Sequence, residues 1–331
     1  MTIAVVILNW NGKSLLEQFL PSVVKHSTQA TVYVADNAST DDSISFVERH
    51  YPQVKIIQNN VNGGYAKGYN DALAKVKEDI FILLNSDVKV TQNWLTPIEK
   101  MFTSSPKIAV IQPKILDYKK KTHFEYAGAA GGFIDRLAYP YCRGRIFNTL
   151  EEDRGQYDND QEIFWASGAC LAIRRSVFEE VNGLDEDYFA HQEEIDLCWR
   201  IKNRGYQCWY TSASSIYHLG GATLNVMNPK KTFYNFRNSL YNILKNVPGF
   251  KAYLLIFIRM LLDAVAGIQF LVQGKPKHFL AILKAHGSFY KNFLRIQKKR
   301  KFIKPSESGD FLFSIVWKYF IKGQKKFHEL S

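Results

Sequence analysis

Apolar runs of strand length alternate with segments of helical spacing along the first ninety or so residues. The runs are rich in β-branched and aliphatic side chains, and in the segments between them apolar positions recur every three to four residues. This strand–helix alternation predicts a mostly parallel sheet with helices on both faces, an α/β fold. The predicted strands are Thr2–Leu8, Ala30–Ala35, Val54–Gln58 and Ile80–Leu84, and the predicted helices are Ser14–Lys25, Asp41–His50 and Ala66–Val76.

The pattern weakens in the middle of the chain and then returns. Residues Tyr118–Gln161 are rich in glycine, charge and aromatic rings, and their weak periodicity predicts a long excursion over the functional site. Phe164–Arg174 is apolar and built of small residues, Ile195–Asn203 has helical spacing that ends at Gly205, and Cys208–Ser212 predicts one more short strand.

The C-terminal third has a different character. Phe233–Leu244, Tyr253–Val272 and Phe279–Leu294 have helical spacing, with aromatic and aliphatic residues interleaved with Lys and Arg. The run Leu254–Val272 approaches the length of a membrane span, but charged and amide residues interrupt it, which favours an interfacial or bundle helix. We therefore expect an α/β catalytic domain at 1–225 and a helical basic appendage at 226–331.

Charge is distributed unevenly between these two parts. The 331 residues carry a net charge of +12, and residues 226–331 hold 20 Lys+Arg against 4 Asp+Glu. Such a tail predicts contact with an anionic surface, and the absence of a nucleic-acid recognition motif favours a membrane over nucleic acid. The expected contact cluster contains Arg295, Lys298, Lys299, Arg300, Lys301 and Lys304, followed by Lys318, Lys322, Lys325 and Lys326 around Phe311, Phe313, Trp317, Tyr319 and Phe320.

The cysteines and the N-terminal residues indicate the cellular compartment of the protein. The four cysteines show no CxxC spacing and do not resemble a secreted disulfide framework, so reduced thiols are expected. Met1–Leu8 is apolar without a basic leader, which predicts a first strand rather than a signal peptide. We expect a cytoplasmic protein that is peripheral on the inner face of the cytoplasmic membrane.

Three polar groups that are distant in sequence carry the candidate chemistry. Asp87 follows the buried run Ile80–Leu84, so its carboxylate should emerge at the carboxyl end of a strand, where α/β sheets bind ligands. Glu194 lies in an acidic segment, and His218 precedes two glycines. A carboxylate and an imidazole suit a divalent cation on a phosphate, and a second carboxylate suits proton removal from a nucleophile.

The order of motifs resembles that of the family 2 inverting glycosyltransferases with a GT-A fold, a Rossmann-like α/β architecture. The bacterial rhamnosyltransferases of surface-polysaccharide synthesis look most similar. The resemblance covers roughly residues 1–225. It rests on Asn9-Trp10-Asn11-Gly12, Val34-Ala35-Asp36-Asn37, Asn62-Gly63-Gly64, Asn85-Ser86-Asp87 and Glu193-Glu194-Ile195-Asp196.

The resemblance implies a donor site for a nucleoside-diphosphate sugar, with UDP or dTDP as the nucleotide. Asp36 would accept a hydrogen bond from the base, and Asp87 with His218 would bind Mg²⁺ or Mn²⁺ on the pyrophosphate; Asn replaces the commoner first Asp of the metal motif at position 85. Read alone, these residues could also serve as helix caps, turns or a structural histidine. The implied donor residues are Asn9, Asp36, Asn62, Gly63, Gly64, Asn70, Asn85, Ser86 and Asp87.

The resemblance also assigns the acceptor side. Glu194, in place of the commoner Asp, would be the general base that deprotonates a hydroxyl of a saccharide acceptor, which is expected to be lipid-linked. Arg237 could pair with the donor pyrophosphate, or make a simple salt bridge or a phospholipid contact. The implied acceptor-binding residues are Trp165, Gly168, Glu193 and Asp196. Read alone, Trp165–Cys170 could be a packed core strand, and Glu193 and Asp196 could fix the start of a helix.

Two other functions fit parts of the sequence. A sugar nucleotidyltransferase shares related sheet architecture but carries a Gly-rich loop with basic residues after the first strand, and Asn9-Trp10-Asn11-Gly12 lacks that loop. A non-catalytic glycan-binding protein on a degenerate transferase core would be expected to have lost Asp87, Glu194 or His218. Because all three positions are chemically competent, the sequence favours the transferase.

Overall fold

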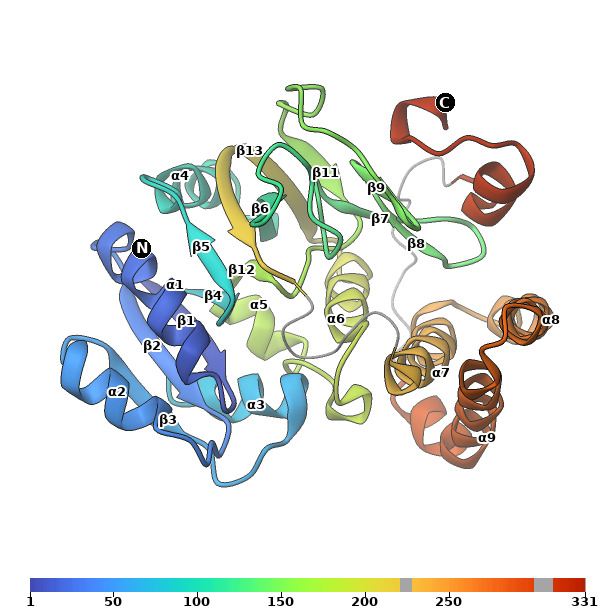
Figure 1. The fold of residues 1–331 in the computed structure, drawn as a ribbon, viewed down its shortest axis with the longest axis horizontal. Coiled ribbons are helices and arrows are strands. Elements are labelled where there is room, and N and C mark those ends of the chain that lie inside the picture. The colour runs from blue at the N-terminus through green and yellow to red at the C-terminus, as the bar shows by residue number, and fades with distance from the viewer. Residues whose placement is uncertain (221–227, 301–311, 331) are drawn as a thin grey trace.

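The computed structural model describes residues 1–220, 228–300 and 312–330 (Figure 1). Its main sheet contains β1 (Ile3–Asn9), β2 (Thr31–Asp36), β3 (Lys55–Gln58), β4 (Ile80–Asn85), β5 (Val88–Val90), β6 (Ile108–Asp117), β11 (Gln161–Ile163), β12 (Cys170–Arg174) and β13 (Gln207–His218). The nine strands follow the order β11-β13-β6-β12-β4-β1-β2-β3, with β5 paired to β13. The strands β1, β2, β3 and β4 run parallel, as do β6 and β13.

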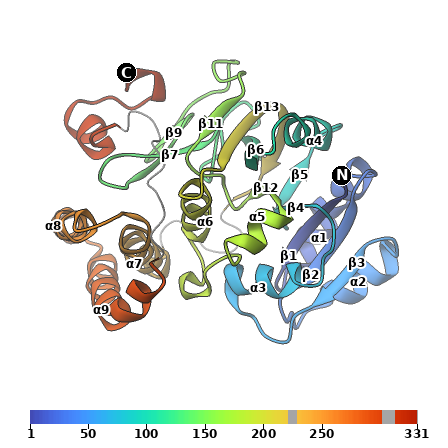
Figure 2. The same cartoon turned by 180° about the vertical axis from the view of Figure 1, so that it is seen from behind.

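Helices cover both faces of this sheet, as the alternating pattern predicts. One face is covered by α1 (Lys13–His26), α2 (Ser43–His50) and α4 (Leu95–Ser104), and the other by α3 (Gly64–Leu73), α5 (Arg175–Glu180) and α6 (Glu193–Lys202) (Figures 1 and 2). Along β1, Ile3, Val5 and Ile7 pack against the helices of the first face, whereas Ala4 and Val6 pack against those of the second. The prediction of a mostly parallel α/β sheet is therefore confirmed.

The second half of the sheet departs from the sequence prediction in detail. Only the end of Phe164–Arg174 is a strand, and this strand, β12, lies antiparallel between β4 and β6. The short strand expected at Cys208–Ser212 extends to His218 because β13 continues past a register shift between Thr211 and Ser215. This extension carries His218 to the same edge of the sheet as the end of β4.

The excursion at 118–161 contains a small second sheet. Four antiparallel strands follow the order β10-β9-β8-β7, and each is two or three residues long, which is too short to show alternation in the sequence. They are β7 (Gly132–Ile134), β8 (Pro140–Cys142), β9 (Arg145–Ile146) and β10 (Thr149–Leu150).

The C-terminal region is helical, as predicted, and packs on the α/β core. It contains α7 (Pro229–Asn246), α8 (Lys251–Val272) and α9 (Pro276–Lys298), and α7 contacts α6, α8 and α9. Near the C-terminus, the backbone N–H of Ile315 donates to Asp135 Oδ2 at 2.8 Å and that of Phe327 donates to Glu151 Oε1 at 3.0 Å. The expected boundary at 225/226 lies outside the described residues, and the helices beyond it form part of one packed body.

One helix in the described ranges, α8, is long and apolar enough to cross a membrane by length and composition alone. Its mean hydropathy is 2.0 over the most apolar window, of which 28% is buried. The same properties occur in core helices of soluble proteins, so they do not decide its environment.

Candidate active site

The carboxyl ends of the parallel strands bring the first two sequence motifs together. The register pairs Asn9 with Asp36 across β1 and β2. Asn9 Nδ2 donates to Asp36 Oδ1 at 3.2 Å, and the backbone N–H of Ser39 donates to Asp36 Oδ2 at 2.9 Å. Asp36 is buried, and Asn9 Oδ1 has no hydrogen-bond partner within the described part of the chain. A buried, unpaired acceptor beside a fixed carboxylate is the arrangement expected of a polar ligand pocket.

The Asn62–Gly64 turn lies against the same strand ends. Asn37 Nδ2 donates to Asn62 Oδ1 at 3.0 Å and to the Gly64 carbonyl at 3.1 Å. Gly64 has φ +75°, and a Cβ there would lie 2.5 Å from the carbonyl oxygen of Phe189. Glycine is therefore required both by the left-handed backbone and by the close approach of the 189 segment.

Asp87, His218 and a further carboxylate, Glu125, form one buried cluster. His218 Nε2 lies 3.1 Å from Asp87 Oδ1, and His218 Nδ1 lies 3.1 Å from Glu125 Oε2. Burial disfavours a charged imidazole, but hydrogen bonds and charge from Asp87 and Glu125 outweigh it and raise the pKa of His218 to about 10. The sequence pair Asp87 and His218 is thus in contact, and Glu125 is a residue that the sequence analysis did not select.

The donor atoms of this cluster fit a divalent cation with two protein ligands. Across the described ranges, no group of three His, Cys, Asp or Glu side chains is arranged to hold a metal ion. Asp87 Oδ1 and His218 Nε2 face each other, however, and the opposite ring nitrogen of His218 faces a carboxylate, as is usual for metal-binding histidines. Mg²⁺ is commonly held by one or two protein groups together with substrate phosphates and water.

Glu193 and Glu194 begin α6, and few polar or cationic groups offset the cost of burying their charges. Burial raises the pKa of Glu194 to about 7, and it raises the pKa of Glu193 further with help from the neighbouring Glu194 charge. Oε2 of each residue is buried without a hydrogen-bond partner among the residues that the structure describes. Glu194 remains partly accessible, whereas Glu193 is buried. Glu194 is therefore the more exposed residue of the pair and the better placed of the two to meet a substrate hydroxyl.

Contacts among Tyr65, Gly168 and the two glutamates join the donor and acceptor segments. Tyr65 Oη donates to the Gly168 carbonyl at 2.8 Å, and a Cβ on Gly168 would lie 2.9 Å from that hydroxyl. Burial, and then the charges of Tyr69, Glu193 and Glu194, raise the pKa of Tyr65, which places both glutamates near this ring. The Asn62–Gly64 turn, the Gly168 segment and the start of α6 therefore meet.

The thiol of Cys142 links this group to the His218 cluster. Burial raises the pKa of Cys142, and the charges of Glu125 and Glu194 add to that effect. Both carboxylates therefore act electrostatically on the same thiol. The Gly168 segment also meets the His218 cluster directly at Asn85, whose backbone N–H donates to the Ala169 carbonyl at 3.1 Å and whose Nδ2 lies 3.5 Å from His218 Nε2.

The segment before α6 has an unusual backbone held by α7. Phe189, His191 and Gln192 have φ of 64°, 69° and 69°, values that cost non-glycine residues about 1 kcal/mol or more each. Asn238 Nδ2 donates to the carbonyls of Tyr188, Ala190 and His191 at 3.2, 3.0 and 2.7 Å.

A second α7 side chain completes this support. Asn242 Nδ2 donates to Gln192 Oε1 at 3.1 Å, and Asn242 Oδ1 accepts from Tyr188 Oη at 2.7 Å. These two asparagines, one helical turn apart, fix the entry to α6. The sequence signal that could have found them is the series of asparagines spaced three or four residues apart along α7, at 235, 238, 242 and 246.

Four predicted contacts acquire other roles in the structure. Asn70 pairs both ways with the backbone of Leu184, at 2.8 and 3.0 Å. Trp165 is buried and donates to the Phe133 carbonyl at 2.9 Å, and Arg237 donates to the carbonyls of Asp187 and Tyr188 at 3.0 and 3.1 Å.

The fourth is Asp196. Its carboxylate is fully buried and pairs with Arg200 at 2.8 Å and with Lys245 at 2.8 Å. Burial alone would raise the pKa of Asp196, but these two cations hold it well below its usual range. The polar groups of Asn70, Trp165, Arg237 and Asp196 are therefore hydrogen-bonded or paired inside the fold, and the ligand contacts expected of them stay predictions.

Part of the basic cluster is also used inside the protein. Lys299 pairs with Asp185 at 2.6 Å and with Asp187 at 2.8 Å, and Arg295 pairs with Asp187 at 3.1 Å. Arg300 donates to the carbonyls of Leu244 and Gly249 at 2.8 and 2.9 Å. Lys301, Lys304 and Phe311 lie outside the described residues.

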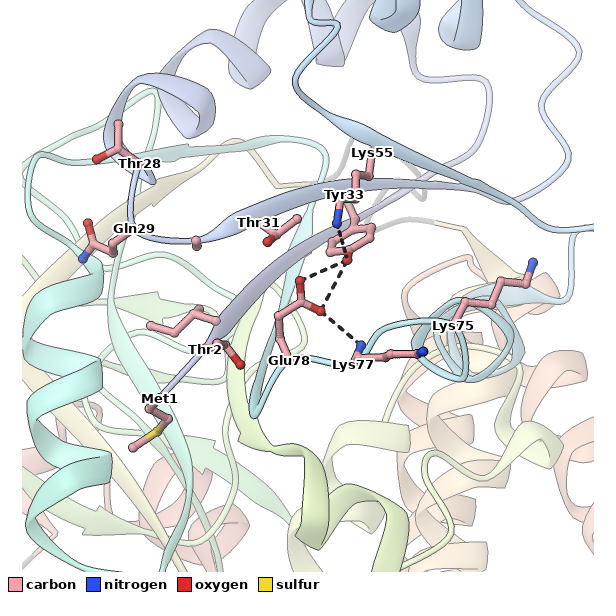
Figure 3. A pocket seen from close by; sticks show the side chains of 12 residues that line it. Met1, Thr2, Thr28, Gln29, Thr31, Tyr33, Lys55, Lys75, Lys77 and Glu78 are labelled. Carbon is pink, nitrogen blue, oxygen red and sulfur yellow. Dashed lines mark hydrogen bonds between the residues drawn. The ribbon is translucent and has the colours of Figure 1, made fainter.

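A cavity lies at the opposite edge of the sheet (Figure 3). It measures about 730 Å³ and lies beside the amino ends of β1 and β2. Its charged lining consists of Lys55, Lys75, Lys77 and Glu78, and Glu78 accepts hydrogen bonds from Tyr33 Oη at 3.0 and 3.3 Å. Ligands of α/β sheets bind at the carboxyl ends of strands, so this cavity is not the site of the chemistry described above.

Comparisons with known proteins agree with the fold and the site. Residues 4–181 match the family described as "Glycosyl transferase family 2", which is more than half of the chain. The chain therefore belongs to glycosyl transferase family 2 and is a glycosyltransferase.

Among curated relatives, the chain is similar to two rhamnosyltransferases. It is 25% identical over 229 residues to the N-acetylglucosaminyl-diphospho-decaprenol L-rhamnosyltransferase of Mycobacterium tuberculosis, covering 65% of this chain and 75% of that protein. It is 23% identical over 223 residues to rhamnosyltransferase WbbL of Escherichia coli K12, covering 65% of this chain and 82% of that protein.

Solved structures show the same fold. S. aureus TarS 1-349 in complex with UDP-GlcNAc matches with a TM-score of 0.53 at 14% identity, covering 94% of this chain and 99% of that one. GalNAc-T7 with UDP, GalNAc and Mn²⁺ matches with a TM-score of 0.56 at 17% identity, covering 73% of this chain and 47% of that one. At these identities the likeness establishes the GT-A-like architecture alone.

Proposed function

We propose that the protein transfers a sugar, with inversion, from a nucleoside diphosphate to a saccharide acceptor by single displacement. The observation that carries this proposal is Glu194, a partly exposed residue whose buried Oε2 has no partner among the described residues and whose pKa burial raises to about 7, near the Asp87–His218 pair. A base with a pKa near the working pH is suited to removing a hydroxyl proton as that hydroxyl attacks.

In this reaction, Glu194 takes the proton of the acceptor hydroxyl while its oxygen bonds to the anomeric carbon. The bond from that carbon to the diphosphate oxygen breaks on the opposite face, so the anomeric configuration inverts. Glu193 is buried beside Glu194, and burial together with the Glu194 charge raises the pKa of Glu193, so Glu193 is the member of the pair that retains a proton more readily. Tyr65 and Gly168, which are joined by a hydrogen bond, would lie between the donor and the acceptor.

Asp87 and His218 would hold Mg²⁺ or Mn²⁺, and Glu125 would orient the imidazole. Bound there, the cation would neutralise charge on the departing diphosphate. Asp36, Asn9 and the Asn62–Gly64 turn would bind the nucleotide, with UDP and dTDP as the candidate donors.

We further propose a lipid-linked saccharide acceptor and a position on the cytoplasmic face of the membrane. The proposal is supported by the similarity to a relative whose name specifies a diphospho-decaprenol acceptor. The basic balance of residues 226–331 also suits an anionic membrane surface.

The test is a donor screen with purified protein and Mg²⁺ or Mn²⁺. UDP- and dTDP-sugars are assayed for slow hydrolysis and for a metal-dependent rise in the melting temperature. A donor that stabilises the protein is then offered short lipid-diphosphate saccharides, and NMR gives the anomeric configuration of the product. Retention of configuration, or donor binding that ignores the metal, would contradict the proposal.

A further inference from the structure

The outer face of α8 is an apolar stripe without a partner in the described chain. Its inner face packs on α7 and α9 and buries Arg259 and Asp263, the latter 3.0 Å from His286 Nε2. Large apolar residues at intervals of three or four positions are 53–83% exposed on the outer face: Leu254, Phe257, Leu261, Val265, Ile268 and Val272. Surface helices of soluble proteins ordinarily place polar residues there.

Helix α9 continues this surface and supplies its charged border. Its exposed apolar residues are Leu280, Leu283, Tyr290 and Leu294. Residues 251–300 contain ten Lys+Arg and one acidic residue, the buried Asp263. Residues 251–300 therefore offer no exposed acidic partner to the exposed lysines beside the apolar stripe, which include Lys251, Lys277, Lys284, Lys291 and Lys298.

We propose that this α8–α9 face docks the protein onto an anionic lipid bilayer, lying in the plane of the interface. The α8 stripe, about 27 Å long at 1.5 Å per residue, would enter the outer acyl region while the lysines contact headgroup phosphates. This inference rests on the proposed function, because a lipid-linked acceptor is presented at such a surface.

Charge favours a bilayer over a second copy of the chain. In a two-fold dimer, the same face meets itself, so the lysine borders of two copies would approach each other without acidic partners. An anionic bilayer provides the complementary charge. A spanning arrangement fits less well, because α8 packs along its length on α7 and α9, and α9 repeats lysines through its middle.

A second exposed aromatic group lies at the same side of the molecule. Phe313, Trp317, Phe320 and Ile321 are 53–68% exposed, with Lys318 and Lys322 between and beside them. Both views place this segment and α8 at the edge of the molecule opposite β3 (Figures 1 and 2). Trp beside Lys is typical of residues at headgroup depth.

The proposed surface differs from the basic cluster that the sequence suggested. Arg295 and Lys299 form ion pairs with Asp187 and Asp185, so their positive charge is partly neutralised within the fold. Docking would instead depend on apolar insertion, with charge in support. Because α7 contacts both α6 and α8, the docked surface would be joined rigidly to the helix that carries Glu194.

The test is vesicle flotation of the full chain with phosphatidylglycerol-containing or pure phosphatidylcholine vesicles, at low and high salt and without donor or acceptor. The triple variant Phe257→Ser/Leu261→Ser/Val265→Ser should lose at least about tenfold in association, since three apolar side chains no longer enter the bilayer. The matched control Phe257→Leu/Leu261→Met/Val265→Ile, which keeps the face apolar, should associate like the parent.

Three results would overturn the proposal. They are a parent that does not float, a serine variant that floats like the parent, and a parent that forms a dimer which the serine substitutions dissolve while vesicles are ignored. Transfer to a water-soluble acceptor analogue is measured separately. Normal transfer with failed flotation would refute the docking surface alone, whereas absent transfer would count against the proposed function.

A labelled variant gives an answer even where the triple variant unfolds. The four native cysteines are buried, so a thiol-reactive, polarity-sensitive dye would attach to Val265→Cys. Its emission should shift to the blue on vesicles, and the same dye on Thr103→Cys of α4 should not respond. Equal responses, or none at Val265→Cys, would contradict insertion of the α8 stripe.

Discussion

His218 Nε2 lies 3.1 Å from Asp87 Oδ1, although Asp87 lies in the turn between β4 and β5 and His218 ends β13, far away in the sequence. The backbone N–H of Leu219 donates to the Asp87 carbonyl at 3.0 Å, and β5 pairs His218 with Val88. Main-chain hydrogen bonds therefore fix the backbone of Asp87 and of His218 relative to each other. Side-chain changes at this pair should alter binding without moving the strands.

Asp87→Ala should abolish the metal dependence of donor binding, because one of the two proposed protein ligands is lost. The measurement is calorimetric titration of the nucleotide with and without Mn²⁺. Asp71→Ala is the control, since Asp71 makes an exposed i,i+4 pair with Lys67. Metal-dependent binding that survives in Asp87→Ala would place the cation elsewhere.

Glu125→Gln should weaken the affinity for Mn²⁺ by about tenfold or more, because a carboxylate no longer orients and polarises the His218 ring. Electron paramagnetic resonance of free Mn²⁺ in the presence of nucleotide gives the affinity without relying on turnover. Glu125→Asp, which keeps the charge, should recover part of the loss. An unchanged affinity in Glu125→Gln would assign Glu125 to the fold alone.

Glu194→Gln should reduce transfer by about a hundredfold or more while leaving donor binding intact, because it removes the proton acceptor and little volume. In the parent, burial raises the pKa of Glu194 to about 7, and only the deprotonated form accepts a proton. Transfer at saturating substrates should therefore rise with pH through about 7 and level off above it. The pH–rate profile of kcat checks this, and equal turnover by the variant would remove Glu194 from the mechanism.

Asn238→Ala should lower both stability and kcat, because three carbonyls of the left-handed segment before α6 lose their donor. The expected loss in the free energy of unfolding is about 1–3 kcal/mol. Urea denaturation measures it, and donor affinity should stay near the parent value. Asn292→Ala is the control, since Asn292 bonds to Ser288 on its own helix. If both variants behave alike, the α7 contact does not position Glu194.

Lys245→Met should destabilise the protein by about 3–5 kcal/mol, because it removes the cation that pairs with the buried carboxylates of both Asp185 and Asp196. Arg200 and Lys245 hold the pKa of Asp196 below its usual range, so this pairing stabilises the fold above the unfolded pKa and is lost as pH falls. Lys245→Met should therefore show a weaker acid dependence of unfolding. The double variant Lys245→Met/Asp196→Leu should recover part of the stability, and a parent-like Lys245→Met would contradict the argument.

The sequence predicts the strand ends of the first half well because parallel strands leave long apolar runs. Asn9, Asp36 and Asn85 follow such runs, and their side chains lie at adjacent strand ends. Glu125 escapes prediction because it lies in a stretch whose strands are too short to show a period. The buried pairing of Asp196 escapes prediction because its partner, Lys245, comes from a helix whose packing no local pattern reveals.

The ion pairs among α6, α7 and α9 have a consequence for how the protein can be divided. The family match ends at residue 181, yet Asp196 depends on Lys245, and Asp185 depends on Lys299. A shortened chain that stops after β13 would leave these carboxylates without Lys245 and Lys299 and would release the start of α6. A relative that lacks counterparts of Lys245 and Asn238 would need other contacts to hold its proton acceptor, so the two halves are not interchangeable modules.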